Sequence, residues 1–346
     1  MHEARVLVVD DSAAMRALFS DVLEQQRNVI VVGTAANASE ARDQIAQLKP
    51  NVITLDVEMP GMSGIDFLKE IMENNPLPVV MLSSLTQAGT ETSLRAYELG
   101  AVECFPKPLK ATPEQFTKTV GKLGKIVLAA ANSNVKDRKN HAPREVKAAD
   151  VAHFTWNGHI VALGASMGGI DALTTVLANW PADCPPTVIT LQSEPALVET
   201  FVNHLDGVLR CSVRYAKDGA TLVPGVVHIA ADPERHVVLE PGTPPKLRLV
   251  ARDPVDGARP SATLLFGTIA RAGVAAVGGV LTGMGADGAK GLKMMRDAGC
   301  RTFVEDPASA TVGEAPSNAV ALGAAEKTLA IGELGEAVIA TCNQAG

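Results

Sequence analysis

The stretch Val161-Ala-Leu-Gly-Ala-Ser-Met-Gly-Gly169 carries the strongest fold signal in this sequence. An apolar run ends in a Gly-x-Ser-x-Gly turn, and residues 170–178 that follow have the pattern of a helix. This order places Ser166 at the carboxyl end of a β-strand, where backbone N–H groups can face a developing negative charge. A glycine-rich turn that holds a nucleotide phosphate at a helix N-terminus is the alternative. The turn alone leaves both interpretations open.

The composition is that of a globular protein with room for two domains. Hydrophobic residues make up 47% and charged residues 20% of the 346 residues. A net charge of -7 argues against a surface that neutralises nucleic-acid phosphates or binds an anionic membrane. We therefore expect no nucleic-acid partner and no membrane insertion.

The cysteines and the termini give no sign of secretion. The five cysteines are scattered without a Cys-x-x-Cys pair, which argues against structural zinc and favours free thiols in a reducing compartment. The first apolar run reaches Asp10 too soon for a signal peptide, and the weakly polar stretch 272–281 is too short to cross a bilayer. These features predict a cytoplasmic protein.

The first part of the chain alternates between short apolar runs and helix-period segments. Arg5-Val-Leu-Val-Val9 has the continuously apolar character of a strand buried on both faces. Further strands are expected over 29–34, 52–55, 79–82 and 102–105, with helices between them, such as 13–26 and 38–48. Repeated βα units of this spacing predict an α/β domain with a doubly wound, parallel, flavodoxin-like sheet.

Polar residues follow the predicted strands of this domain. They are Asp10 and Asp11 after the first strand, Asp56 after the third, Ser83 after the fourth and Lys107 after the fifth. Because the carboxyl ends of parallel strands meet at one edge, these side chains should converge. Carboxylate oxygens suit Mg²⁺, so Asp10, Asp11 and Asp56 are the candidate metal ligands. Asp56 is the candidate phosphoryl acceptor, and Ser83 and Lys107 are placed to sense its new charge.

These residues, with Met59-Pro60-Gly61 and Lys107-Pro108, resemble the receiver domain of two-component response regulators over residues 1–125. The resemblance implies phosphorylation of Asp56 by a partner histidine kinase, with Mg²⁺ bound. Cys104 stands where many receivers carry an aromatic switch residue. The polar residues that follow have no apolar periodicity, and we assign 126–153 to a linker.

Residues 154–346 predict a second α/β domain. Strands are expected over 187–191 and 275–281, and helices over 201–209 and 289–298. A β-rich excursion is expected to contain 226–230 and 237–240. The turn Thr282-Gly-Met-Gly-Ala-Asp-Gly288 repeats the order of strand, glycine turn and helix seen around Ser166. Two such turns from parallel strands bring Ser166 and Asp287 to one edge of a mostly parallel, doubly wound, Rossmann-like sheet.

A hydroxyl nucleophile needs a base, and no histidine follows His236. This excludes the usual α/β-hydrolase order, in which the histidine follows the acid. The second half instead resembles the catalytic domain of chemotaxis protein-glutamate methylesterases, the CheB family, which also stands behind a receiver domain. The segments that carry the resemblance are 164–169, 218–219, 224–225, 229–236, 259–261 and 281–288.

This second resemblance implies hydrolysis of γ-glutamyl methyl esters on methylated chemoreceptors, often with glutamine deamidation, and no cofactor in the hydrolytic step. Ser166 would attack the ester carbonyl, and Asp287 would orient the base. Backbone N–H groups near Met167 and Met284 would hold the oxyanion.

One member of the family's triad is replaced. The family's base lies in a Gln-His pair after the strand that follows the serine turn, and here that strand ends in Gln192-Ser193. Serine does not take a proton at neutral pH as imidazole does. Ala258 and Thr263 also stand where the family commonly has His and Asp. Two hypotheses follow: an esterase whose base comes from elsewhere, for which His204, His228 and His236 are candidates, or a phospho-accepting binding module that has lost catalysis.

Overall fold

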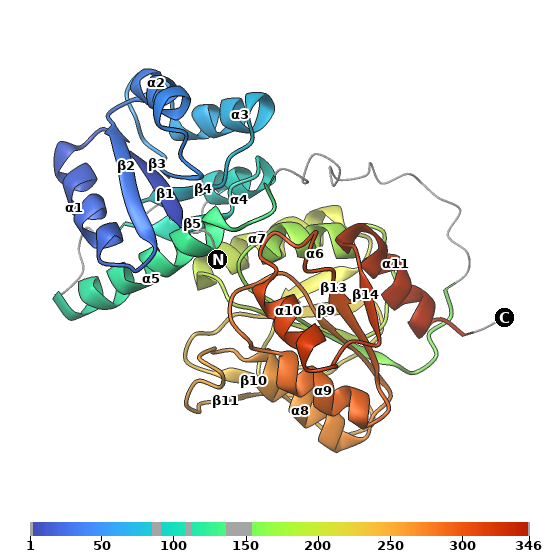
Figure 1. Ribbon diagram of the computed structural model, residues 1–346. Coiled ribbons are helices and arrows are strands. Elements are labelled where there is room, and N and C mark those ends of the chain that lie inside the picture. Colours follow the sequence, from blue (N-terminus) through green and yellow to red (C-terminus); the bar gives the residue numbers. More distant parts are fainter. Residues whose placement is uncertain (1–2, 85–90, 108–112, 136–153, 345–346) are drawn as a thin grey trace. The chain divides into compact units, whose positions relative to one another are not determined.

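The computed structural model describes residues 3–84, 91–107, 113–135 and 154–344 (Figure 1). The chain divides into two compact units, Met1–Arg138 and Lys139–Gly346. Both are α/β units built on a parallel sheet, as the sequence predicts. Among the described helices, none combines the length and the apolarity needed to cross a bilayer.

Unit 1 contains a five-stranded sheet in the order β2-β1-β3-β4-β5. Its strands are β1 (Ala4–Val9), β2 (Val29–Ala35), β3 (Val52–Asp56), β4 (Val79–Ser83) and β5 (Glu103–Pro106). Its helices are α1 (Ala13–Glu24), α2 (Ala38–Leu48), α3 (Gly64–Asn74), α4 (Glu91–Glu98) and α5 (Pro113–Ala131). All neighbouring strands are parallel, so their carboxyl ends share one edge.

Local sequence explains where these helices begin. The side chains of Ser12, Asn37 and Ser63 each accept a hydrogen bond from a backbone N–H of the first turn of α1, α2 and α3. Every residue of β3 and β4 is buried, as expected for central strands covered by helices on both faces. The core is therefore the sheet itself with the helix faces that cover it.

Unit 2 contains a seven-stranded parallel sheet in the order β14-β13-β12-β6-β7-β9-β8, and a separate hairpin, β10-β11. Its strands are β6 (Ile160–Ala165), β7 (Thr187–Leu191), β8 (Ser212–Tyr215), β9 (Val226–Ala230), β10 (His236–Glu240), β11 (Lys246–Val250), β12 (Ala276–Val280), β13 (Arg301–Glu305) and β14 (Lys327–Leu329). Its helices are α6 (Gly169–Leu177), α7 (Pro195–Val208), α8 (Ala262–Ala272), α9 (Ala289–Asp297), α10 (Glu314–Ala321) and α11 (Ile331–Cys342).

Three sequence-based expectations need correction. Residues 226–230 belong to the main sheet, between β7 and β8, and only β10-β11 forms an excursion. Helix α7 begins at Pro195 rather than at 201, because proline fits the first helical position. Helix α5 continues to Ala131, so the first six residues of the expected linker 126–153 are helical. Val127 and Ala130 are buried there, and residues 136–153 lie outside the described part of the chain.

Each sheet has a point where the strand order reverses. In unit 1 it lies between β1 and β3, and in unit 2 between β6 and β12. Crevices at the carboxyl ends of strands beside such a point are the usual ligand sites of open α/β sheets. Both sites predicted from the sequence fall there.

Candidate functional sites

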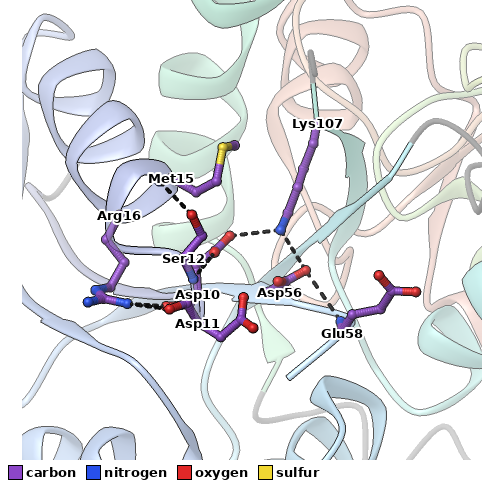
Figure 2. A network of polar contacts seen from close by, with 8 residues as sticks. All are labelled: Asp10, Asp11, Ser12, Met15, Arg16, Asp56, Glu58 and Lys107. Carbon is purple, nitrogen blue, oxygen red and sulfur yellow. Dashed lines mark hydrogen bonds and ion pairs between the residues drawn. The ribbon is translucent and has the colours of Figure 1, made fainter. Parts of the chain in front are cut away.

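The three aspartates predicted to bind a metal lie together in unit 1. One carboxylate oxygen each from Asp10, Asp11 and Asp56 lies within 4.8 Å of the others. The Lys107 ammonium donates to Asp10 Oδ2 at 2.8 Å and to Asp56 Oδ1 at 2.7 Å, as Figure 2 shows. Asp10, Asp56 and Lys107 are buried. One buried lysine thus bonds two buried carboxylates, and the exposed Asp11 adds a third, which leaves net negative charge at the site.

Further bonds fix the loop that carries two of these aspartates. Ser12 N donates to Asp10 Oδ1 at 3.0 Å, and the Arg16 guanidinium donates to the carbonyls of Asp10 and Asp11 (Figure 2). Burial raises the pKa of the Asp56 carboxyl. The Asp10 carboxylate adds to that effect, whereas Lys107 and the Glu58 N–H oppose it. A divalent cation would favour the ionised form that burial disfavours.

Ser83 lies where the sequence places it, at the end of β4. Its hydroxyl is buried and has no hydrogen-bond partner within the described residues. Buried hydroxyls are normally bonded, so Ser83 Oγ is available to a group added beside it. A hollow that is open to solvent borders the site and is lined by Asp11, Glu58, Met59 and Thr92, among others.

The position of the missing aromatic switch residue has its own polar cluster. Cys104 N donates to the Tyr97 hydroxyl at 3.0 Å and to Glu103 Oε1 at 3.1 Å, and the Tyr97 hydroxyl donates to Glu103. Burial raises the pKa of Glu103 to about 7, against the opposing effect of these two donors. The aromatic side chain that contacts β5 at this position is therefore Tyr97, which belongs to α4.

In unit 2, Ser166 follows β6 directly. Its N–H donates to the Thr282 carbonyl at 3.1 Å, and its Oγ accepts from Met284 N at 3.0 Å. The close approach of the two glycine turns requires Gly283, because a Cβ there would collide with the Ser166 hydroxyl. Gly168 adopts φ +78°, which favours glycine. The Ser166 hydroxyl thus lies against the backbone of the second glycine turn, with the Met284 N–H directed at its oxygen.

Thr282 joins the two turns. Its buried hydroxyl donates to the Met167 carbonyl at 2.9 Å and accepts from Val312 N at 2.9 Å. Its own N–H donates to the buried Glu305 carboxylate at 2.7 Å. These bonds fix Met167 and Met284, the two residues predicted to line the oxyanion site, relative to each other.

The Asp287 carboxylate is held by four donors. Oδ1 accepts from Ser261 Oγ at 2.6 Å and Thr263 N at 3.1 Å, and Oδ2 accepts from Gln192 Nε2 at 2.8 Å and Ala262 N at 2.8 Å. Three of these donors form the start of α8, where N–H groups and the helix dipole favour an anion. Asp287 and Ser166 both line one small cavity of about 10 Å³, which holds about one water molecule.

Ser193 lies at the same edge as Ser166. Strand pairing places Leu191 beside Ala165, and Gln192 N donates to the Ala165 carbonyl. Ser193 follows immediately, in the bend before α7. The position that the resemblance assigns to the base is therefore beside the serine turn, and it carries a hydroxyl.

None of the three candidate substitute histidines contacts Ser166 or Asp287 within the described residues. His204 is exposed on α7. His228 is buried in β9 beside Val188, three residues and about 10 Å before the carboxyl end of β7. His236 is buried, and both of its ring nitrogens are engaged by backbone groups.

Three polar residues at this site received no individual role from the sequence: Gln192, Ser261 and Thr282. Ser261 and Thr282 belong to segments that carry the family resemblance, and Gln192 belongs to the Gln-Ser pair in which the family's histidine is replaced; these were the only signals available. Their bonding partners are distant in the sequence. Ser261 and Gln192 bond Asp287 across 26 and 95 positions, and Thr282 bonds Met167 across 115 positions.

Comparison with known proteins finds a family match in each part of the chain. Residues 161–338 match the family model "CheB methylesterase", and residues 6–120 match "Response regulator receiver domain". A protein-glutamate methylesterase/protein-glutamine glutaminase 1 of Caulobacter vibrioides is 44% identical over 98% of both chains. A second relative, the protein-glutamate methylesterase/protein-glutamine glutaminase of Agrobacterium fabrum, is 44% identical over 97% of this chain and 96% of its own length.

The solved structures include a similar catalytic domain. The CheB methylesterase catalytic domain of Thermotoga maritima is 27% identical, with a TM-score of 0.51, and the match covers 54% of this chain and 99% of that domain. The family model covers more than half of the chain, and relatives match it along nearly its whole length. The chain therefore belongs to the CheB methylesterase family, with a response-regulator receiver domain preceding the methylesterase domain.

Proposed function

We propose that this protein is a phosphorylation-regulated protein-glutamate methylesterase that also deamidates glutamine. Its substrates are methylated chemoreceptors, and a histidine kinase of the same chemosensory pathway phosphorylates it. The observation that carries the proposal is the Ser166 hydroxyl at the switch point of a parallel sheet, 3.0 Å from Met284 N. Its five cysteines are free thiols, which fits the reducing cytoplasm.

The hydrolytic step uses Ser166 as the nucleophile. Its Oγ attacks the ester carbonyl carbon, its proton passes to a base, and methanol leaves with a proton from that base. Water then attacks the acyl-serine and releases the glutamate carboxylate. The N–H groups of Met284 and Met167 hold the oxyanion of both tetrahedral intermediates. Asp287 holds the base in orientation.

The receiver site fits a phosphoryl acceptor and Mg²⁺. The negative charge of the buried Asp10 and Asp56 and the exposed Asp11, and the unpartnered Ser83 hydroxyl, both suit such an addition. Bound Mg²⁺ would neutralise charge on the transferred phosphoryl group. Asp56 would accept the phosphoryl group, and Ser83 and Lys107 would bond its oxygens.

A second candidate function is a phospho-accepting binding module with little turnover. The observation that favours it is the absence of any histidine in contact with Ser166 or Asp287 among the described residues. Removing the base from a serine triad lowers kcat by about a millionfold, about 8 kcal/mol. Such a protein would still bind receptor segments and accept phosphate on Asp56.

Methanol release from methylated receptor fragments tests both candidates. We would compare the parent chain with Ser166→Ala and Asp56→Asn, each with and without a small phosphodonor and Mg²⁺. A methylesterase gives release that the phosphodonor stimulates, that Ser166→Ala abolishes and that Asp56→Asn leaves unstimulated. Release equal to Ser166→Ala, from a chain that still becomes phosphorylated, rejects the esterase in favour of the binding module.

A further inference from the structure

His236 is buried at the start of β10 and contacts two other segments of unit 2. Its Nδ1 accepts the N–H of Ser261 at 3.1 Å, and its Nε2 lies 3.1 Å from the carbonyl of Asp253. A backbone N–H only donates and a carbonyl only accepts, so the ring is neutral, with its hydrogen on Nε2. Because both nitrogens are occupied, His236 is not the missing base.

The residue that His236 holds is the N-cap of α8. The Ser261 side chain accepts from Leu264 N at 3.2 Å and donates to Asp287 Oδ1. The next two N–H groups, from Ala262 and Thr263, also donate to Asp287. The N–H of Ser261 itself is fully buried and is not one of the four donors to Asp287, so it needs a separate acceptor. The His236 ring is that acceptor.

Arg259, which lies in the same loop before α8, makes further hydrogen bonds that hold this loop in place. Its guanidinium donates to the carbonyls of Pro233 and Arg252 and to the Glu234 carboxylate. The loop before α8 is therefore fastened to the turn that precedes β10 by Arg259 and to β10 itself by His236. The β10-β11 hairpin therefore supports the N-terminus of α8, whose N–H groups bond Asp287.

We propose that His236 is a positioning residue of the hydrolytic site, which fixes Asp287 through the N-terminus of α8. The inference rests on the proposed role of Asp287 in the hydrolysis. It assigns to His236 no contact with substrate and no proton transfer. Loss of its two hydrogen bonds should loosen residues 261–263 and displace Asp287 without unfolding the domain.

A pair of side chains of similar size tests this in the full chain. His236→Gln retains one acceptor and one donor, whereas His236→Met retains neither. The matched control is His228→Met, since His228 is also buried but makes no hydrogen bond to residues 261–263 or to Asp287 among the described residues. His236→Leu, whose side chain likewise has neither an acceptor nor a donor, replaces His236→Met if that variant does not fold.

Hydrogen–deuterium exchange of the segment 259–266 gives a readout that needs no catalysis. We expect His236→Met to speed exchange there about tenfold, with little change in β6 or β12. His236→Gln should stay close to the parent, and His228→Met should not differ from it. Equal exchange in parent and His236→Met, or an equal rise in His228→Met, would overturn the proposal.

Kinetics give the second readout, in the parent or in a Ser193→His background, whichever hydrolyses ester. We expect His236→Met to lower kcat about tenfold and leave KM within about twofold, with kcat recovered in His236→Gln. An unchanged kcat alongside faster exchange would also overturn the positioning role. Absence of hydrolysis in every background would count against the proposed function alone, because exchange still reports on α8.

Discussion

The receiver site and the hydrolytic site are built on the same plan but are not equally complete. Each lies where the strand order of a parallel sheet reverses, with one acidic side chain held by several donors. In unit 1, all five residues proposed for phosphoryl transfer lie at the site: Asp10, Asp11, Asp56, Ser83 and Lys107. In unit 2, the proposed nucleophile Ser166 and the proposed acid Asp287 lie at the site, and the position that the resemblance assigns to the base carries Ser193.

The difference shows that the framework of a site can be complete where one of the family's side chains is replaced. The glycine turns, the Thr282 bridge and the four donors to Asp287 are all in place, although Ser193 stands at the position that the resemblance assigns to the base. These bonds join the two glycine turns to each other and Asp287 to the start of α8, so they also contribute to the packing of unit 2.

Placing a histidine at position 193 should have the largest effect on activity, and it would make the hydrolytic site as complete as the receiver site. Ser193→His puts an imidazole beside the serine turn, and we expect methanol release to rise at least about a thousandfold, about 4 kcal/mol of barrier. The control is Ser193→His with Ser166→Ala, which should release none. A parent that is already active and gains nothing would show that another group serves as the base.

A pH effect on stability should distinguish the units. Because burial raises the pKa of Glu103 to about 7, folded unit 1 binds a proton that the unfolded chain releases near its ordinary value of 4.5. The contribution of Glu103 to the free energy of unfolding should be highest below pH 4.5, fall as pH rises to about 7, and level off above it. The fall is at most about 3 kcal/mol.

Urea unfolding followed in unit 1 between pH 4 and 8 measures this fall. Glu103→Gln should flatten the profile, while the exposed Glu24→Gln should leave it as in the parent. A profile that keeps its slope in Glu103→Gln would assign the pH dependence to other groups.

Removing one carboxylate should have the smallest of these effects. Asp10→Asn leaves two carboxylates at the site, and we expect Mg²⁺ to bind about tenfold more weakly, about 1.4 kcal/mol. Calorimetric titration with Mg²⁺ measures it, with the exposed Asp43→Asn as control. Unchanged affinity in Asp10→Asn would place the metal on other ligands.

The sequence by itself determined the two parallel sheets and most of their strands. Continuously apolar runs such as Val161–Leu163 and Val6–Val9 have one stable environment, a strand covered on both faces. The residue that follows such a strand is then placed at a known edge. For this reason Asp10, Asp56, Ser83, Lys107, Ser166 and Asp287 could all be located from their positions in the chain.

Only the tertiary structure decided which groups hold the acid and which histidines are remote. Gln192 and Ser261 reach Asp287 across 95 and 26 positions, and His236 engages Ser261 across 25. No local pattern specifies such pairs, because they depend on side-chain direction after helices and strands have packed. Strand periodicity places a residue at an edge, whereas hydrogen-bond geometry, which is set by packing, decides what that residue does there.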